Sequence, residues 1–163
     1  MQLKNTQNVL RDLAKYVIKQ SRSALSKKDK NTTKGLYESL GYNIETSTNE
    51  TKVVFTMADY GLFVDKGVSG KKEKHNTPYS FKNKKPPMEP IMKWAKARNF
   101  RFRDKKGKYV KGNYRSIAFV LQNSIYNKGI KPSLFFTRPF NMAIDKYKKD
   151  IATAYLQDQI NKL

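Results

Sequence analysis

The order of hydrophobic and polar positions divides the chain into helical and extended stretches. Residues 3–25 carry apolar side chains at three- and four-residue spacing with cations between them, which predicts an amphipathic helix. Two middle helices are predicted, one starting at Met88 after a double proline and one running from Ile117 to a stop at Gly129. A long terminal helix is predicted from Pro139 onward.

Alternation and β-branched residues predict a β-hairpin near the first helix. Residues 35–44 alternate in part, residues 46–50 have turn chemistry, and residues 52–57 form a β-branched run. A second, shorter pair of strands is predicted at residues 100–103 and 109–110. The expected fold class is α+β: a small antiparallel sheet with a β-hairpin packed against an N-terminal helix, two middle helices and a long C-terminal helix.

Two further segments interrupt this pattern. Residues 58–67 predict a short helical or extended segment that Gly67 ends. Residues 68–87 contain many lysines, several Gly and Pro turn sites and little periodicity, so we expect a long, basic, exposed loop. Residues 26–33 predict another loop. By length, residues 1–163 form a single domain.

Composition excludes several classes of protein. The chain has no Cys, which excludes disulfides and thiolate metal sites, and His75 is its only histidine. No apolar run approaches the roughly 18 residues of a membrane span, and the first residues lack the apolar segment of a secretory signal. We therefore expect an intracellular protein with no membrane partner, no metal site and no cofactor.

The charge is extreme and uneven. The chain has 34 basic and 13 acidic residues, a net charge of +21, and residues 66–115 alone contain 17 basic and 3 acidic residues. Such a field attracts polyanions, which include nucleic acid and acidic protein surfaces. A lysine-rich, solvated face without a specific partner is the other interpretation.

No arrangement of residues predicts catalysis. Asp59 and Asp65 flank an apolar segment, but metal-assisted hydrolysis needs a carboxylate cluster, and the glutamates are scattered. His75 has no neighbouring Ser, Cys or Asp in a triad arrangement, and no Gly-rich phosphate loop follows a strand. We expect that the protein is not an enzyme.

Nucleic-acid binding is the alternative function that the sequence leaves open. Residues 100–103 alternate Phe and Arg, and three lysines follow at positions 105, 106 and 108, as in platforms for single strands. Two aromatic residues on a strand also fit a protein core. The alternative is thus a basic, sequence-independent nucleic-acid-binding protein, since no helix-turn-helix or zinc ligand set is present.

Large aromatic residues near the last predicted helix are candidate anchors of an interface, because such side chains dominate both cores and interfaces. In an extended link, neighbouring residues point to opposite sides. One ring of the adjacent pair Phe135 and Phe136 can therefore enter the core while the other faces a partner. The candidate interface residues are Trp94, Phe135, Phe136, Arg138, Phe140, Tyr60 and Asp65. The candidate basic contacts to neighbours or DNA are Lys71, Lys72, Lys74, Lys82, Lys84, Lys85, Arg101 and Arg103.

Three segments resemble the tail-component or tail-completion family of tailed bacteriophages. They are a Gly-Leu-x-x-Ser-Leu strand at residues 35–40, the segment at residues 58–67, and Phe-Phe-Thr-Arg-Pro-Phe at residues 135–140. The family motifs read Tyr-Ala-x-Tyr-Val-Glu-x-Gly-Thr and Pro-Phe-Leu-x-Pro-Ala. Residues 86–98 and 125–136 are similar to versions in phages of gut Bacteroidetes, including crAss-like phages. The sequence departs from the family at residues 65–68.

The resemblance implies a structural role in a virion. It implies an α+β head–tail connector, neck or upper-tail subunit that forms a ring of six or twelve copies and docks on a portal, adaptor or adjacent tail ring. Genomic DNA passes through the channel of such a ring. The expected location is the virion neck or tail, with assembly in the host cytoplasm.

Overall fold

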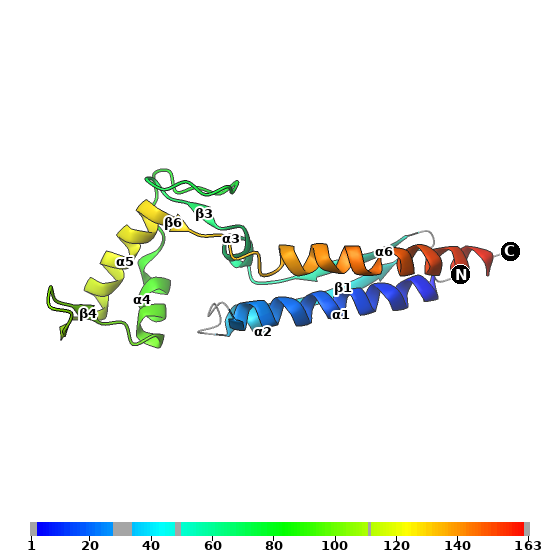
Figure 1. The fold of residues 1–163 in the computed structure, drawn as a ribbon, viewed down its shortest axis with the longest axis horizontal. Coiled ribbons are helices and arrows are strands. Elements are labelled where there is room, and N and C mark those ends of the chain that lie inside the picture. Colours follow the sequence, from blue (N-terminus) through cyan, green and yellow to red (C-terminus); the bar gives the residue numbers. More distant parts are fainter. Residues whose placement is uncertain (1–2, 28–33, 48–49, 111, 162–163) are drawn as a thin grey trace. The chain divides into compact units, whose positions relative to one another are not determined.

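The computed structural model describes residues 3–27, 34–47, 50–110 and 112–161 of the chain (Figure 1). Its contacts fall into two compact units. Unit 1 comprises residues 1–31, 35–61 and 134–163, and unit 2 comprises residues 32–34 and 62–133. The α+β class is confirmed, with helices and small antiparallel sheets in the described residues. No helix in these ranges is long and apolar enough to cross a membrane.

Two long helices dominate unit 1. Helix α1 (Lys4–Lys27) and helix α6 (Thr137–Ile160) lie side by side and antiparallel, so that both termini are at one end (Figure 1). Leu13 and Val17 of α1 and Ala143 of α6 form a buried cluster at their contact. Partly buried side chains surround it: Tyr16, Phe55, Phe136, Phe140, Tyr147 and Ile151. The predicted terminal helices are confirmed.

The predicted hairpin of unit 1 is present but shorter than expected. Strands β1 (Gly41–Thr46) and β2 (Thr51–Thr56) pair antiparallel, with Thr46 opposite Thr51. Residues 35–40 do not continue the strand, because helix α2 (Gly35–Ser39) occupies them. Leu36 and Leu40, both buried, are four residues apart. This spacing fits one turn of a helix as well as alternation in a strand, which explains the wrong prediction.

Unit 2 contains the two middle helices and a small hairpin. Helix α4 (Met88–Ala97) packs against helix α5 (Tyr114–Lys128), and strands β4 (Phe102–Arg103) and β5 (Tyr109–Val110) form the connecting hairpin. Helix α5 begins before the predicted Ile117 because the Asn113 side chain accepts a hydrogen bond of 2.8 Å from the backbone N–H of Ser116.

A close crossing of backbones orders the rest of unit 2. Helix α3 (Gly61–Lys66), whose first residue belongs to unit 1, ends at Gly67 as predicted, at φ +75°. Strand β3 (Val68–Ser69) then pairs antiparallel with β6 (Gly129–Ile130). A Cβ atom on Gly70 would lie 2.2 Å from the carbonyl oxygen of Asn127, so only glycine fits there.

The prediction of an exposed loop at residues 68–87 is wrong for its first part. Val68, Ser69 and Gly70 are buried, and the chain beyond them is tied to α5 and β3. The backbone N–H of Lys71 donates to the Tyr126 carbonyl (2.9 Å), and that of Phe81 donates to the Ser69 carbonyl (2.9 Å). The second predicted loop is shortened too, since α1 extends through Lys27, and residues 28–33 lie outside the described ranges.

Candidate functional site

The aromatic pair at the start of α6 packs inside unit 1. Phe135 is fully buried. The Phe136 ring is partly buried and meets the Phe55 ring edge-on, with centroids 5.3 Å apart, and stacks on Phe140 at 6.0 Å. Leu134, just before the pair, has φ +51°, which turns the chain sharply. Both rings therefore have partners within the chain, and only Phe136 and Phe140 retain some exposed surface.

The other predicted interface residues differ in accessibility. Asp65 is buried and offers no surface to a neighbour. Arg138 is exposed on α6, and Tyr60 is exposed over almost half of its surface, although partial burial raises the pKa of its hydroxyl. Trp94 is half-buried in unit 2, where its ring lies 5.1 Å from that of Phe100. The candidate interface residues thus divide between the two units.

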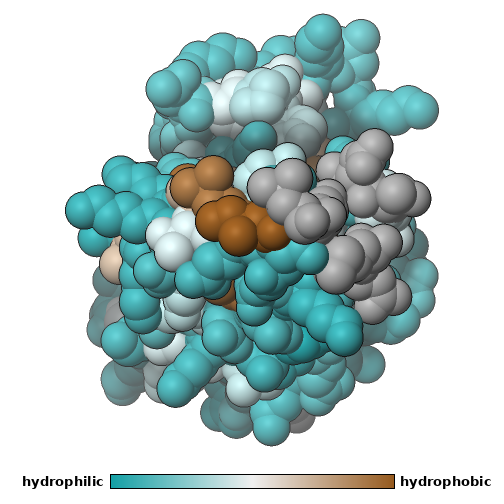
Figure 2. All heavy atoms as spheres, turned by 90° about the vertical axis from the view of Figure 1, so that its right-hand side faces the viewer, coloured by the Kyte–Doolittle hydropathy of each residue, from teal (hydrophilic) through white to brown (hydrophobic). Residues whose placement is uncertain are grey.

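Sequence reasoning missed an exposed apolar region near the end of α6. Ile160 and Leu156 are 66% and 62% exposed, one helical turn apart. Figure 2 views the end of the molecule where both termini lie and shows hydrophobic atoms gathered among hydrophilic ones. The signal available in the sequence was Leu156, which falls outside the stripe that packs on α1.

The excess charge is concentrated in one unit. Unit 1 contains 14 basic and 9 acidic residues, a net of +5, whereas unit 2 contains 20 basic and 4 acidic residues, a net of +16. The exposed apolar end of α6 therefore belongs to the less basic of the two units. Unit 2 provides the field that attracts polyanions.

Three of the predicted basic residues of the 68–87 segment, Lys71, Lys82 and Lys85, lie along α5. The Lys85 ammonium donates to the Asn123 side chain (2.7 Å) and lies 5.8 Å from the Phe119 ring centroid. The Tyr126 hydroxyl donates to the Lys82 carbonyl (2.8 Å). Lys71 lies over the Tyr126 ring at 5.9 Å. The structure thus brings two predicted cations, Lys71 and Lys85, together with exposed or half-buried aromatic rings.

The remaining predicted cations of unit 2 are more dispersed. Lys72 and Lys84 are exposed, as is Lys74, whose ammonium donates to the Gly70 carbonyl (3.2 Å). Arg101 and Arg103 are in or beside the β4–β5 hairpin. Among the described residues, no contact joins either arginine to the lysines along α5.

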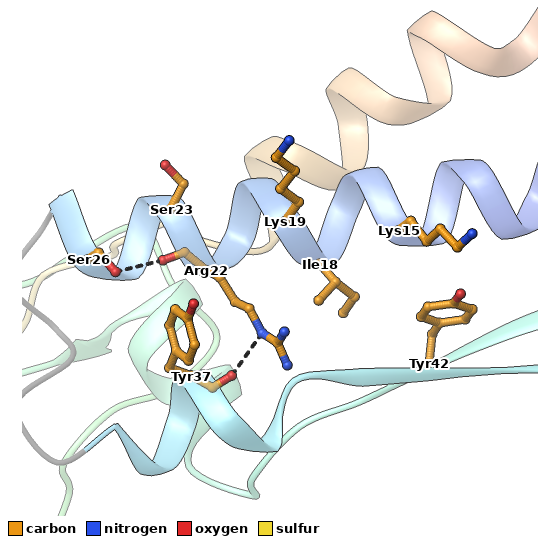
Figure 3. A pocket seen from close by; sticks show the side chains of 8 residues that line it. All are labelled: Lys15, Ile18, Lys19, Arg22, Ser23, Ser26, Tyr37 and Tyr42. Carbon is orange, nitrogen blue, oxygen red and sulfur yellow. Dashed lines mark hydrogen bonds between the residues drawn. The ribbon is translucent and has the colours of Figure 1, made fainter.

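A recess of about 520 Å³ opens in unit 1 between α1, α2 and β1 (Figure 3). Ile18 lies between Tyr37 and Tyr42, and Lys15 extends towards Tyr42. The Arg22 guanidinium is already engaged: it donates to the carbonyls of Tyr37 (3.2 Å) and Leu40 (3.0 Å). Arg22 therefore joins α1 to the α2–β1 connection, and Lys15 and Lys19 are the other cations that line the recess.

Within the described ranges, no group of three or more His, Cys, Asp or Glu side chains is placed to hold a metal ion. The His75 ring nitrogen Nε2 lies 2.9 Å from the Lys128 carbonyl oxygen. Asp59 is exposed, whereas Asp65 is buried. The described surface presents exposed apolar side chains and many cations.

In comparisons with family models, with curated proteins and with solved structures, nothing matches the chain.

Proposed function

We propose that the chain is a structural subunit of the head–tail connector, neck or upper tail of a tailed bacteriophage, and that its copies form a ring. The observation that supports this role best is the unequal charge of the two units, together with the exposed apolar end of α6. Unit 1, with a net charge of +5, exposes Leu156 and Ile160, while unit 2 carries +16. One unit is suited to contacts between copies and the other to an anionic partner.

The apolar end of α6 is the proposed contact between neighbouring copies. Large apolar side chains that are more than half exposed lose most of their contact with water on association, and full burial of one contributes about 1.5–3 kcal/mol. The low net charge of unit 1 keeps repulsion between these surfaces small. Tyr60, Phe136, Arg138 and Phe140 of the same unit are further candidate interface residues, and the last three lie at the start of α6, the opposite end of the helix from Leu156 and Ile160.

The proposed partners follow from the sequence resemblance and the charge of unit 2. Acidic surfaces on a portal, adaptor or adjacent tail ring would orient docking, and the phosphates of genomic DNA in the channel would be attracted by the same field. Assembly rather than catalysis is the proposed activity. The proposed location is the neck or tail of the virion.

Electron microscopy of the purified full-length chain, without nucleic acid, tests the ring. We expect closed particles with six or twelve copies, in greater number at high salt because salt screens repulsion between the basic units. Open filaments, or a monomer that binds duplex DNA stoichiometrically and loses it as salt increases, would overturn the proposal and favour a basic nucleic-acid-binding protein.

A further inference from the structure

Unit 2 contains an aromatic recess that the proposed ring does not use. It has a volume of about 370 Å³ and lies between the end of α4, the β4–β5 hairpin and the start of α5. Three aromatic side chains line it, those of Phe100, Tyr109 and Tyr114. Ile117, which is buried, and Arg101 complete its apolar and cationic parts. Tyr109 is 63% exposed, so most of its side chain is accessible to a ligand.

Cations are held against the rings of this recess. The guanidinium carbon of Arg103 lies 4.5 Å from the Tyr109 ring centroid, and its Nη2 donates to the Tyr109 hydroxyl (2.7 Å). Lys96 lies 5.9 Å from the Tyr114 centroid. Positive charge and aromatic surface are therefore positioned together before any ligand arrives.

Acidic groups do not neutralise this surface. Residues 96–115 contain nine basic residues and one acidic residue, Asp104. The carboxylate of Asp104 accepts hydrogen bonds from the backbone N–H groups of Lys106 and Lys108, both 2.9 Å, and so stabilises the hairpin turn. The lysines of the turn are left to interact with an external anion.

We propose that the recess binds an unstacked base of a single-stranded nucleic acid, while the hairpin cations bind the adjacent phosphates. Aromatic side chains beside cations bind single strands because every base has a π face, whereas bases in a duplex are stacked on one another and cannot reach the rings. Charge complementarity alone would favour the binding of both single-stranded and duplex nucleic acid. The concave aromatic lining is what favours the single strand. This binding does not depend on ring formation.

The chain contains its own reporter for this test. Trp94 is its only tryptophan and its ring centroid is 5.1 Å from that of Phe100, which lines the recess. Trp94 fluorescence is followed while the full-length protein is titrated with an oligothymidylate and, separately, with a duplex of equal length, at several salt concentrations. We expect saturable quenching, with tighter binding of the oligothymidylate.

Variants separate stacking from charge. Tyr109→Ala should weaken binding of the oligothymidylate roughly 5- to 150-fold without changing its salt dependence, because one aromatic ring releases no counterions. Tyr109→Phe, which keeps the ring, should bind within about twofold of the wild type. Tyr155→Ala, which removes an exposed ring from α6, is the matched control and should change nothing. Circular dichroism checks that each variant is folded.

Two results would overturn the inference. One is equal affinity for duplex and single strand together with wild-type binding by Tyr109→Ala, which would indicate attraction by charge alone. The other is the absence of any binding by the folded wild-type protein at low salt. Neither result bears on the proposed ring, which is measured by particle symmetry without nucleic acid.

Discussion

The carboxylate of Asp158, near the end of α6, binds the first turn of α1 through Thr6. It accepts hydrogen bonds from the Thr6 backbone N–H (2.8 Å) and hydroxyl (2.7 Å), and a third from the backbone N–H of Asn5 (3.1 Å). The first N–H groups of a helix have no partner within the helix. A residue 152 positions away thus caps α1 and fixes the alignment of the two long helices.

Replacing this carboxylate should weaken unit 1 measurably. Asp158→Ala removes a buried, charged acceptor and leaves the Asn5 and Thr6 N–H groups unpaired, which costs about 1.5–3 kcal/mol. Chemical denaturation followed by circular dichroism measures the loss. Asp150→Ala removes an exposed carboxylate from the same helix and should cost less than about 0.5 kcal/mol. Equal stability of the two variants would contradict the capping role.

The same bond should give stability a specific pH dependence. Burial alone would raise the pKa of Asp158, but the hydrogen bonds from Thr6 and Asn5 outweigh it and lower the pKa below its ordinary value of 3.8. The stabilisation is therefore fully present above the unfolded-state pKa and is lost as the pH falls through the folded-state pKa. The advantage of wild type over Asp158→Asn should shrink below about pH 4. A stability advantage of wild type that stays constant down to the lowest pH would be inconsistent with the stabilising role of the ionised Asp158 carboxylate.

Phe135 and Phe136 should respond differently to truncation. Phe135→Ala empties a fully buried site and should cost about 3–5 kcal/mol of unfolding free energy. Phe136→Ala removes a partly buried ring that meets Phe55 and Phe140, and it should cost less. If Phe136→Ala stays folded but its particles lose symmetry, Phe136 also serves as an interface residue. A smaller loss of unfolding free energy for Phe135→Ala than for Phe136→Ala would contradict the fuller burial of Phe135.

The crossing of β3 and β6 can be tested with two glycines that share a positive φ. A Cβ on Gly129 (φ +77°) would lie 2.2 Å from the Val68 carbonyl oxygen, whereas a Cβ on Gly107 (φ +81°) would have no neighbour within 4 Å. Gly107→Ala should therefore cost only the backbone strain of a positive φ, about 1 kcal/mol. Gly129→Ala should cost considerably more in thermal unfolding. Similar melting temperatures for Gly129→Ala and Gly107→Ala would show that the β3–β6 crossing can be disrupted without loss of stability.

Local patterns predicted most of the elements but few of their contacts. The amphipathic spacing of α1 and α6 and the β-branched run of β2 are visible in the sequence because each depends on neighbouring residues. The capping of α1 by Asp158 could not be predicted, since it joins residues at opposite ends of the chain. Nor does any local signal indicate that Leu134 adopts a positive φ.

The candidate site was predictable in its composition and not in its geometry. The sequence showed the basic, Phe- and Arg-rich segment at residues 100–103. It could not show that Tyr114, from the following helix, lines the same recess as Phe100 and Tyr109. The candidate interface residue Asp65 is buried because its polar side chain lies in a segment enclosed by tertiary packing, which composition does not reveal.

The molar mass of the nucleic-acid-free protein, measured by light scattering at high salt, tests the central proposal most directly. The mass should be six or twelve times 18.9 kDa. The double variant Leu156→Glu with Ile160→Glu should reduce it to that of one chain while the helical circular dichroism is preserved. Val120→Glu, which alters an apolar residue of α5 in unit 2 that is 51% exposed, should leave the mass unchanged. A wild-type mass of 18.9 kDa at every protein concentration would contradict the account.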